Sequence, residues 1–279
     1  MSDGFPQRIV CLTEEPTEVL YALGLAERIV GISGFTVRPP QARKEKPKVS
    51  AFTSAKLDKI LALEPDLAIG FSDMQADIAR ALIKAGVEVW VSNHRSVAGI
   101  LAYIRRLGAM VGAVGGAEKL AARAEAHIAS IRSQAARLER RPRVYFEEWD
   151  DPQISAIGWV SELIAIAGGD DIFPDMATQS LGRNRIIADP AEPARRQPDI
   201  IIGSWCGKKF RPGKVAVREG WQDVPAVVND ELHEIKSSII LQPGPAALFD
   251  GLDALHAIIA RWAGKQPAEA QASSSSQRA

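Results

Sequence analysis

The sequence lacks the patterns that usually reveal an enzyme, a membrane protein or a nucleic-acid-binding protein. It contains no Gly-x-Ser-x-Gly, no Walker phosphate loop, no His-Glu-x-x-His and no Cys-x-x-Cys, so several familiar catalytic and metal sites are excluded. Its 34 basic and 34 acidic residues cancel, which argues against general nucleic-acid binding. No apolar run approaches the roughly 18 residues of a membrane span, so no membrane insertion is expected.

Cysteine is also scarce. Cys11 and Cys206 are the only two, too few for a disulfide framework, and they leave the redox compartment open. The first seven residues show neither the basic segment nor the apolar segment of a secretory leader. We therefore expect a cytoplasmic protein as sequenced, or a periplasmic one if a leader is missing or has been removed.

One six-residue pattern occurs twice. Pro65–Gly70, Pro-Asp-Leu-Ala-Ile-Gly, reappears as Pro198–Gly203, Pro-Asp-Ile-Ile-Ile-Gly. A short apolar run bounded by Pro and Gly predicts a strand buried on both faces. Apolar runs at Arg8–Leu12 and Arg143–Phe146 open the two halves in the same order. The repeat favours two α/β lobes of similar design. The alternative is that two unrelated α/β domains share similar residues at the ends of their strands and helices.

Apolar strands alternate with amphipathic helices in a first lobe, residues 1–116, which predicts a mostly parallel sheet. The expected strands are Ile9–Leu12, Ile29–Ile32, Leu67–Ile69 and Val87–Val91, and the helices are Thr17–Leu23, Leu57–Leu63, Gln75–Ala85 and Val97–Val111. Ligands of such sheets tend to bind beyond the carboxyl ends of the strands.

A long helix should join this lobe to a second one. Glu118–Arg140 contains no Gly or Pro and repeats apolar residues every three or four positions, so a linking helix is predicted over 117–141; an ordinary packed helix is the alternative. The second lobe, 142–265, should contain strands Val144–Phe146, Ile200–Ile202 and Val227–Val228 and a helix over Ala246–Trp262. The tail, 266–279, should be disordered. The predicted fold is α/β, with two mostly parallel-sheet lobes, a long rigid helix and a ligand cleft between the lobes.

Large and polar side chains gather in the loops that follow the strands, although aromatic residues make up only 6% of the chain. Flat rings at a cleft suit a large planar ligand. The predicted ligand contacts are Glu15, Phe35, Arg38, Phe52, Phe71, His94, Glu148, Trp149, Trp205, Cys206 and Lys208.

Several of these residues could instead have a structural or solvent-exposed role without a ligand. Arg38 and Lys208 could be solvated charges, and the acids of Glu147–Asp151 are typical of a solvated loop more than of a cation site. His94 and Cys206 could bind a metal, but packed side chains are more common, so no metal site is assigned. Trp159 is predicted to pack in the core, and Trp205 is predicted to contact the ligand.

Three segments then show a family resemblance. Arg8–Glu18, Lys48–Ser50 leading into Leu57–Asp66, and Gly168–Phe173 resemble the class III substrate-binding proteins of ABC importers, the vitamin B12 and ferric-siderophore group, over about residues 7–264. The resemblance implies two lobes joined by a rigid helix, with the ligand between them. It is greatest to cobalamin-binding members, which carry aromatic ligand contacts at the positions of Phe35, Phe52 and Phe71.

The resemblance also implies docking on a permease through one carboxylate in each lobe. Asp58 matches the first, while Ala191 occupies the second position, with Glu192 beside it and Pro193 interrupting the expected helix. We expect a monomeric, non-catalytic protein without cofactor that binds cobalamin or a related corrinoid for ABC-type uptake. One alternative is a ferric-siderophore or haem binder, which Arg38 and Lys208 would suit. Another is a cytoplasmic sensor or metal-dependent enzyme that uses His94, Cys206 and the acids of residues 147–151.

Overall fold

The computed structural model describes residues 4–265, so the predicted disordered tail lies outside the described residues. The chain forms two α/β units with parallel sheets, which confirms the predicted fold class. Unit 1 comprises the residues up to His127 together with Ser238–Phe249, and unit 2 comprises Ile128–Ser237 and the residues from Asp250 onward. The predicted linking helix is therefore shared: its first part belongs to unit 1 and the rest to unit 2.

Unit 1 contains five parallel strands in the order β3-β2-β1-β4-β5. They are β1 Ile9–Cys11, β2 Ile29–Ser33, β3 Lys48–Ser50, β4 Leu67–Phe71 and β5 Glu88–Ser92. All five residues of β4 are buried, as expected of a continuous apolar run covered on both faces. Sequence reasoning found four of these strands and did not assign β3, which has only three residues.

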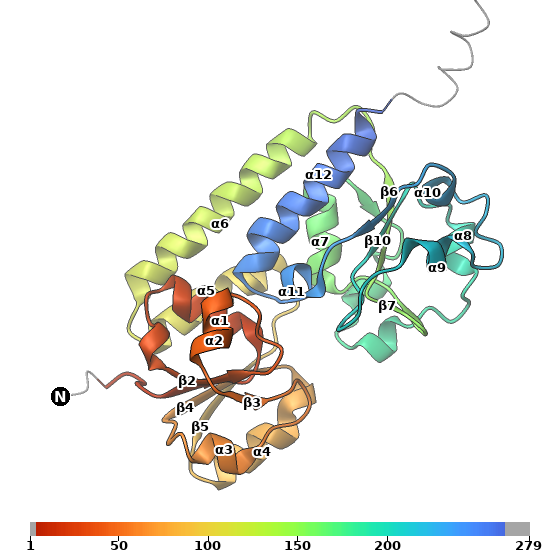
Figure 1. Ribbon diagram of the computed structural model, residues 1–279. Coiled ribbons are helices and arrows are strands. Elements are labelled where there is room, and N and C mark those ends of the chain that lie inside the picture. The colour runs from red at the N-terminus through yellow and green to blue at the C-terminus, as the bar shows by residue number, and fades with distance from the viewer. Residues whose placement is uncertain (1–3, 266–279) are drawn as a thin grey trace, which may run out of the picture. The chain divides into compact units, whose positions relative to one another are not determined.

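Helices cover both faces of this sheet. Figure 1 shows α3 and α4 on one face and α1 and α5 on the other. Their bounds are α1 Glu14–Ala22, α2 Pro40–Glu45, α3 Leu57–Leu61, α4 Ala76–Lys84, α5 Val97–Met110 and α6 Val114–Ala135, with 3-10 turns at Ala26–Arg28 and Asp73–Gln75. A core that includes Val10, Ile60, Ala68 and Leu82 lies between the α4 face and the strands.

Unit 2 contains a parallel four-stranded sheet in the order β11-β10-β6-β9 and a two-stranded antiparallel pair, β7-β8. The strands are β6 Arg143–Glu147, β7 Trp149–Asp150, β8 Gln153–Ile154, β9 Asp170–Asp171, β10 Ile200–Gly203 and β11 Leu232–Glu234. Its helices are α7 Gly158–Ala167, α8 Glu192–Arg195, α9 Pro212–Ala216, α10 Pro225–Val228 and α12 Leu252–Ala263, with 3-10 turns at Met176–Thr178 and Gly182–Arg185.

The chain passes from unit 2 into unit 1 and back near its C-terminal end. Helix α11, Ser237–Ile240, begins at the crossing, and a π-helix over Ala247–Gly251 spans the return before α12 begins. The predicted helix Ala246–Trp262 is therefore correct in place, but its first turn is wider than an α-helix.

Two predictions about unit 2 were wrong. Val227 and Val228 form the last two residues of helix α10 and do not form a strand, because Pro225 at the first helical position favours a helix start. The strand that follows is β11. Pro193 does not break a helix, because it lies in the first turn of the short α8, where proline is tolerated.

The Gly-Gly element has a clear physical reason. Gly168 ends α7 in the left-handed conformation, with φ +102°, which favours glycine. A Cβ on Gly169 would lie 2.8 Å from a methyl of Val144. The element thus fixes how α7 meets the sheet of unit 2.

Candidate ligand-binding site

In each sheet, the chain leaves two neighbouring strands in different directions. We call the carboxyl ends of the strands at this point the candidate edge of that unit. In unit 1, β1 pairs with β2 on one side and with β4 on the other; in unit 2, β6 pairs with β9 and with β10. Crevices beyond the carboxyl ends of such strands are the usual ligand sites of α/β sheets. The predicted contacts follow these strand ends, so each unit has its own candidate edge.

Two glutamates open helix α1 at the unit 1 edge. Glu15 is 1% exposed, and Thr13 Oγ1 donates a 2.7 Å hydrogen bond to its Oε1. Burial raises the pKa of Glu15 to about 8, and the neighbouring Glu14 carboxylate adds to the rise. Burial also raises the pKa of Glu14 to about 7. Near neutral pH these carboxyl groups are therefore protonated to a large extent, and a protonated carboxyl can donate a hydrogen bond.

Apolar side chains stand exposed at the same edge. Phe35 is 55% exposed and Val37 38% exposed after β2, and Met74 is 50% exposed after β4. Phe52, after β3, is half-buried. Exposed apolar side chains that follow neighbouring strands of one sheet are typical of a binding surface.

The late segment Ser238–Phe249 also contributes to this edge. Glu18 accepts a 2.9 Å hydrogen bond from the backbone N–H of Ala246 and forms a 3.2 Å ion pair with Arg38. Gly244 lies against Glu15, so closely that a Cβ there would be 2.9 Å from the Glu15 Cβ. The unit 1 edge is thus built from residues far apart in sequence.

His94 and Phe71 meet at the ends of β5 and β4. Their ring centroids are 5.2 Å apart in an edge-to-face arrangement, and the Arg95 guanidinium lies 4.4 Å from the centroid of Phe71. His94 Nε2 lies 2.8 Å from the carbonyl oxygen of Pro243. Because a carbonyl only accepts, Nε2 carries the proton and Nδ1 has the lone pair.

The environment keeps His94 neutral. Burial lowers the pKa of His94 to about 4; the hydrogen bond to Pro243 opposes this, and Arg95 and Arg106 add to it. Its Nδ1 is buried and has no hydrogen-bond partner within residues 4–265. An unprotonated imidazole nitrogen of this kind can accept a hydrogen bond or bind a metal.

Glu147, at the end of β6, is a buried structural group. It is 0% exposed and accepts hydrogen bonds from Trp205 Nε1 at 2.9 Å, from the Tyr145 hydroxyl at 3.0 Å and from both terminal nitrogens of Arg218. The prediction that the acids of residues 147–151 form a solvated loop is wrong for Glu147, because an arginine and two aromatic donors replace its water.

Trp149, Trp205 and Lys208 come together in unit 2. Lys208 Nζ lies 4.0 Å from the ring centroid of Trp149 and 5.2 Å from that of Trp205, and it forms an ion pair with Asp150. Trp149 is half-buried, whereas Trp205 is 3% exposed and packs edge-to-face on Phe210. This placement favours a contact role for Trp149 and a supporting role for Trp205.

The remaining predicted contacts in unit 2 differ in exposure. Glu148 forms an ion pair with Arg185, whose side chain is 1% exposed, at 2.7 Å. Cys206 is exposed. Within residues 4–265, no group of three or more His, Cys, Asp or Glu side chains is arranged to hold a metal ion. Trp159 is buried, as predicted.

The two predicted docking carboxylates have unlike surroundings. Asp58 is exposed in the first turn of α3. Glu192 forms ion pairs with Arg195 at 2.6 Å and with Arg196 at 2.9 Å, and these two arginines hold the pKa of Glu192 below its usual range.

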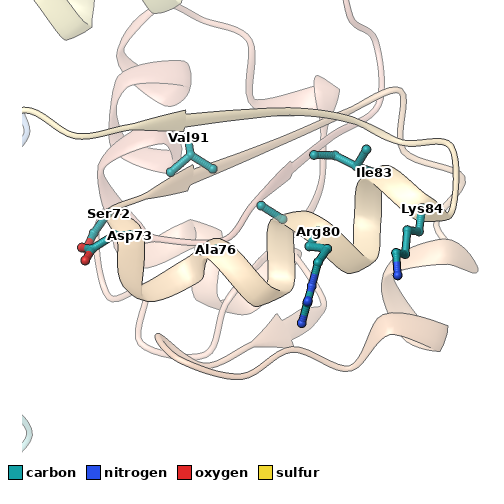
Figure 2. A pocket seen from close by; sticks show the side chains of 8 residues that line it. Ser72, Asp73, Ala76, Arg80, Ile83, Lys84 and Val91 are labelled. Carbon is teal, nitrogen blue, oxygen red and sulfur yellow. The ribbon is translucent and has the colours of Figure 1, made fainter.

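A hollow of about 520 Å³ lies between α4 and β5 of unit 1. Figure 2 shows Val91 pointing from β5 towards α4, while the charged ends of Arg80 and Lys84 point away from that strand. None of the predicted ligand contacts lines it. One end of the hollow, at Ser72 and Asp73, directly follows β4.

Sequence reasoning missed the cations that organise the unit 2 edge. Arg218 and Arg185 neutralise buried or half-buried acids that lie 71 and 37 residues away along the chain. Tyr103, stacked on His94 with centroids 4.6 Å apart, was also missed. No local pattern signals such distant partners.

Comparison with known proteins identifies the class. Residues 9–239 match the family described as periplasmic binding protein, and the chain belongs to that family. Proteins named as ABC-transporter substrate-binding, vitamin B12-binding and haem-binding proteins are among those that it resembles. The family resemblance seen in the sequence is thus confirmed.

Three relatives illustrate the similarity. A vitamin B12-binding protein of Vibrio campbellii is 25% identical over 248 residues, 87% of this chain and 86% of that protein. The structure of the periplasmic vitamin B12-binding protein BtuF of Vibrio cholerae has a TM-score of 0.74 and 24% identity, covering 94% of this chain and 99% of that one. The periplasmic haem-binding protein RhuT of Roseiflexus, in its apo form, has a TM-score of 0.74 and 27% identity, covering 91% and 99%.

These relatives bear on two further expectations. They are binding proteins by name, in agreement with a non-catalytic role. The two solved ones are periplasmic, so the expected cytoplasmic location has no support from them. Within residues 4–265, no helix combines the length and apolarity of a membrane span.

Proposed function

We propose that the protein binds cobalamin or a closely related corrinoid and delivers it to an ABC permease. The observation that carries the proposal is the unit 1 edge, where exposed Phe35 and Val37 follow β2 and the buried Glu14 and Glu15, whose carboxyl pKa values are raised by burial, follow the neighbouring strand β1. A corrinoid is a large ring rimmed by amide groups. Apolar surface can cover its ring, and neutral carboxyl groups can exchange hydrogen bonds with its amides.

The charges near the predicted contacts support the same ligand class. Arg38 pairs with Glu18 and Lys208 with Asp150. An anionic chelate such as haem or a ferric siderophore would have to break these pairs to gain charge-assisted hydrogen bonds. A ligand with amide groups leaves them intact.

Calorimetric titration with cyanocobalamin tests the proposal, with haemin and a ferric hydroxamate titrated in parallel. We expect binding at micromolar or lower concentration for the corrinoid and weaker binding for the two anionic chelates. Absence of heat and of tryptophan quenching with cyanocobalamin, alongside tight binding of either competitor, would contradict it.

Haem is the second candidate, because His94 carries a buried nitrogen lone pair without a partner within residues 4–265. The haem-binding relative RhuT, at 27% identity, adds to this case. Haemin should then give a shifted Soret band that His94→Ala abolishes. A spectrum unchanged by that substitution would count against haem binding through His94.

A further inference from the structure

A second hollow of unit 1, of about 300 Å³, lies at the carboxyl end of β5 beside the first turns of α5. The rings of Trp90, Tyr103 and His94 line it. Trp90 and Tyr103 stack with centroids 5.2 Å apart and planes 11° apart, and Tyr103 and His94 stack at 4.6 Å and 27°. Tyr103 stacks with both of the other rings, so a stack of three rings forms the aromatic wall of the hollow.

Arg106 supplies the one charge among the residues that line this hollow. Its side chain is exposed, and no carboxylate of residues 4–265 pairs with it. The adjacent Arg105 contrasts with it, because Arg105 pairs with Glu118 at 2.8 Å and with Glu125 at 3.0 Å. The hollow thus combines an aromatic wall with an uncommitted guanidinium.

The surroundings favour negative charge in a guest. Besides burial, both Arg95 and Arg106 lower the pKa of His94, so two cations act on the same wall while the imidazole stays neutral. The polar side chains of Ser92 and Asn93 complete the lining. A guanidinium pairs well with a planar carboxylate or with a phosphate.

We propose that this hollow binds a planar ring that carries one anionic group, with the ring against this aromatic wall and the anion on Arg106. The volume lies at the small end of ligand pockets, so it suits a single ring system and not a whole metal chelate. Two sources have this chemistry: the phosphate-bearing nucleotide tail of a corrinoid, and a free aromatic acid. The site does not depend on corrinoid binding.

The test uses benzimidazole-5-carboxylate as the probe, measured by calorimetry and by saturation-transfer NMR on the full chain. We expect saturable binding to the wild type that Arg106→Gln weakens at least about tenfold, since a charge-assisted hydrogen bond is lost. Arg105→Gln, one residue away on the same helix, should bind the probe like the wild type. Binding equal in all three proteins, or no binding at millimolar probe, overturns the proposal.

A competition experiment distinguishes the two sources. Cyanocobalamin carries the nucleotide tail and dicyanocobinamide does not. Displacement of the probe by the first alone supports the site with the tail as its ligand, and retention of the probe with both supports it with a free aromatic acid. Failure of cyanocobalamin to bind while the probe still binds would refute the corrinoid proposal alone.

Discussion

Arg218 binds the Glu147 carboxylate through two hydrogen bonds, Nη1 to Oε2 at 2.6 Å and Nη2 to Oε1 at 2.9 Å. Glu147 ends the central strand β6, and Arg218 follows α9, 71 residues later in the chain. The pair therefore ties an irregular part of unit 2 to its sheet at the candidate edge.

Arg218→Met should destabilise the protein by about 3–5 kcal/mol, because it leaves a buried carboxylate without its partner. Urea unfolding followed by circular dichroism measures this loss. The control is Arg105→Met, which removes two ion pairs at the surface and should change stability little. Adding Glu147→Gln to Arg218→Met should recover part of the loss. Losses of equal size in Arg218→Met and Arg105→Met would contradict the argument.

Stability should fall as the pH rises from 5 to 8.5. The pKa values of Glu14 and Glu15 are raised from 4.5 to about 7 and about 8. Their contribution is fully present below pH 4.5 and is lost as the pH rises through 7 and 8, by up to about 4 kcal/mol for Glu15.

Urea midpoints across this pH range check the slope, and Glu15→Gln should flatten it. The exposed Glu27 offers a control, since Glu27→Gln should leave the slope as it is. A wild type equally stable at both ends of the range would rule out the burial effect.

Trp149 and Trp205 should separate binding from folding. Trp149→Ala should weaken cyanocobalamin binding about tenfold or more with little change in Tm, because its half-buried ring stands beside Lys208. Trp205→Ala should instead lower Tm by several degrees, since it removes a core ring and a donor to Glu147. Calorimetry and thermal unfolding of both variants decide the matter, and the opposite pattern would make Trp205 the contact.

Asp58 should matter more than Glu192 for permease docking. Asp58 is exposed, whereas Glu192 must first part from Arg195 and Arg196. Asp58→Asn should reduce stimulation of ATP hydrolysis by the cognate transporter in proteoliposomes several-fold, and Glu192→Gln should reduce it less. Unchanged stimulation with Asp58→Asn would remove this carboxylate from the docking proposal.

The fold was largely predictable because buried parallel strands leave continuous apolar runs between Pro and Gly. Pro65–Gly70 and Pro198–Gly203 both proved to hold central strands, β4 and β10. Val227–Val228 misled because two apolar residues fit a strand or a buried helix turn equally well, and Pro225 decided for the helix.

The candidate edges were predictable only in outline. Segments that follow strands could be read from the sequence, and they do hold the exposed Phe35 and the half-buried Trp149, although Trp149 lies in the short strand β7 and not in a loop. The neutralisation of Glu147 could not, because it depends on Arg218 and on tertiary packing. Charge in the sequence therefore said little about which groups remain available to a ligand.

Unit 1 is discontinuous, because Ser238–Phe249 returns to it from the far end of the chain. That segment supplies the carbonyl of Pro243 to His94 and the amide of Ala246 to Glu18. A fragment cut after His127 would remove one hydrogen-bond partner from each of these two side chains. Producing the first half by itself therefore calls for grafting the late peptide onto its new end, and plain truncation would yield an incomplete domain.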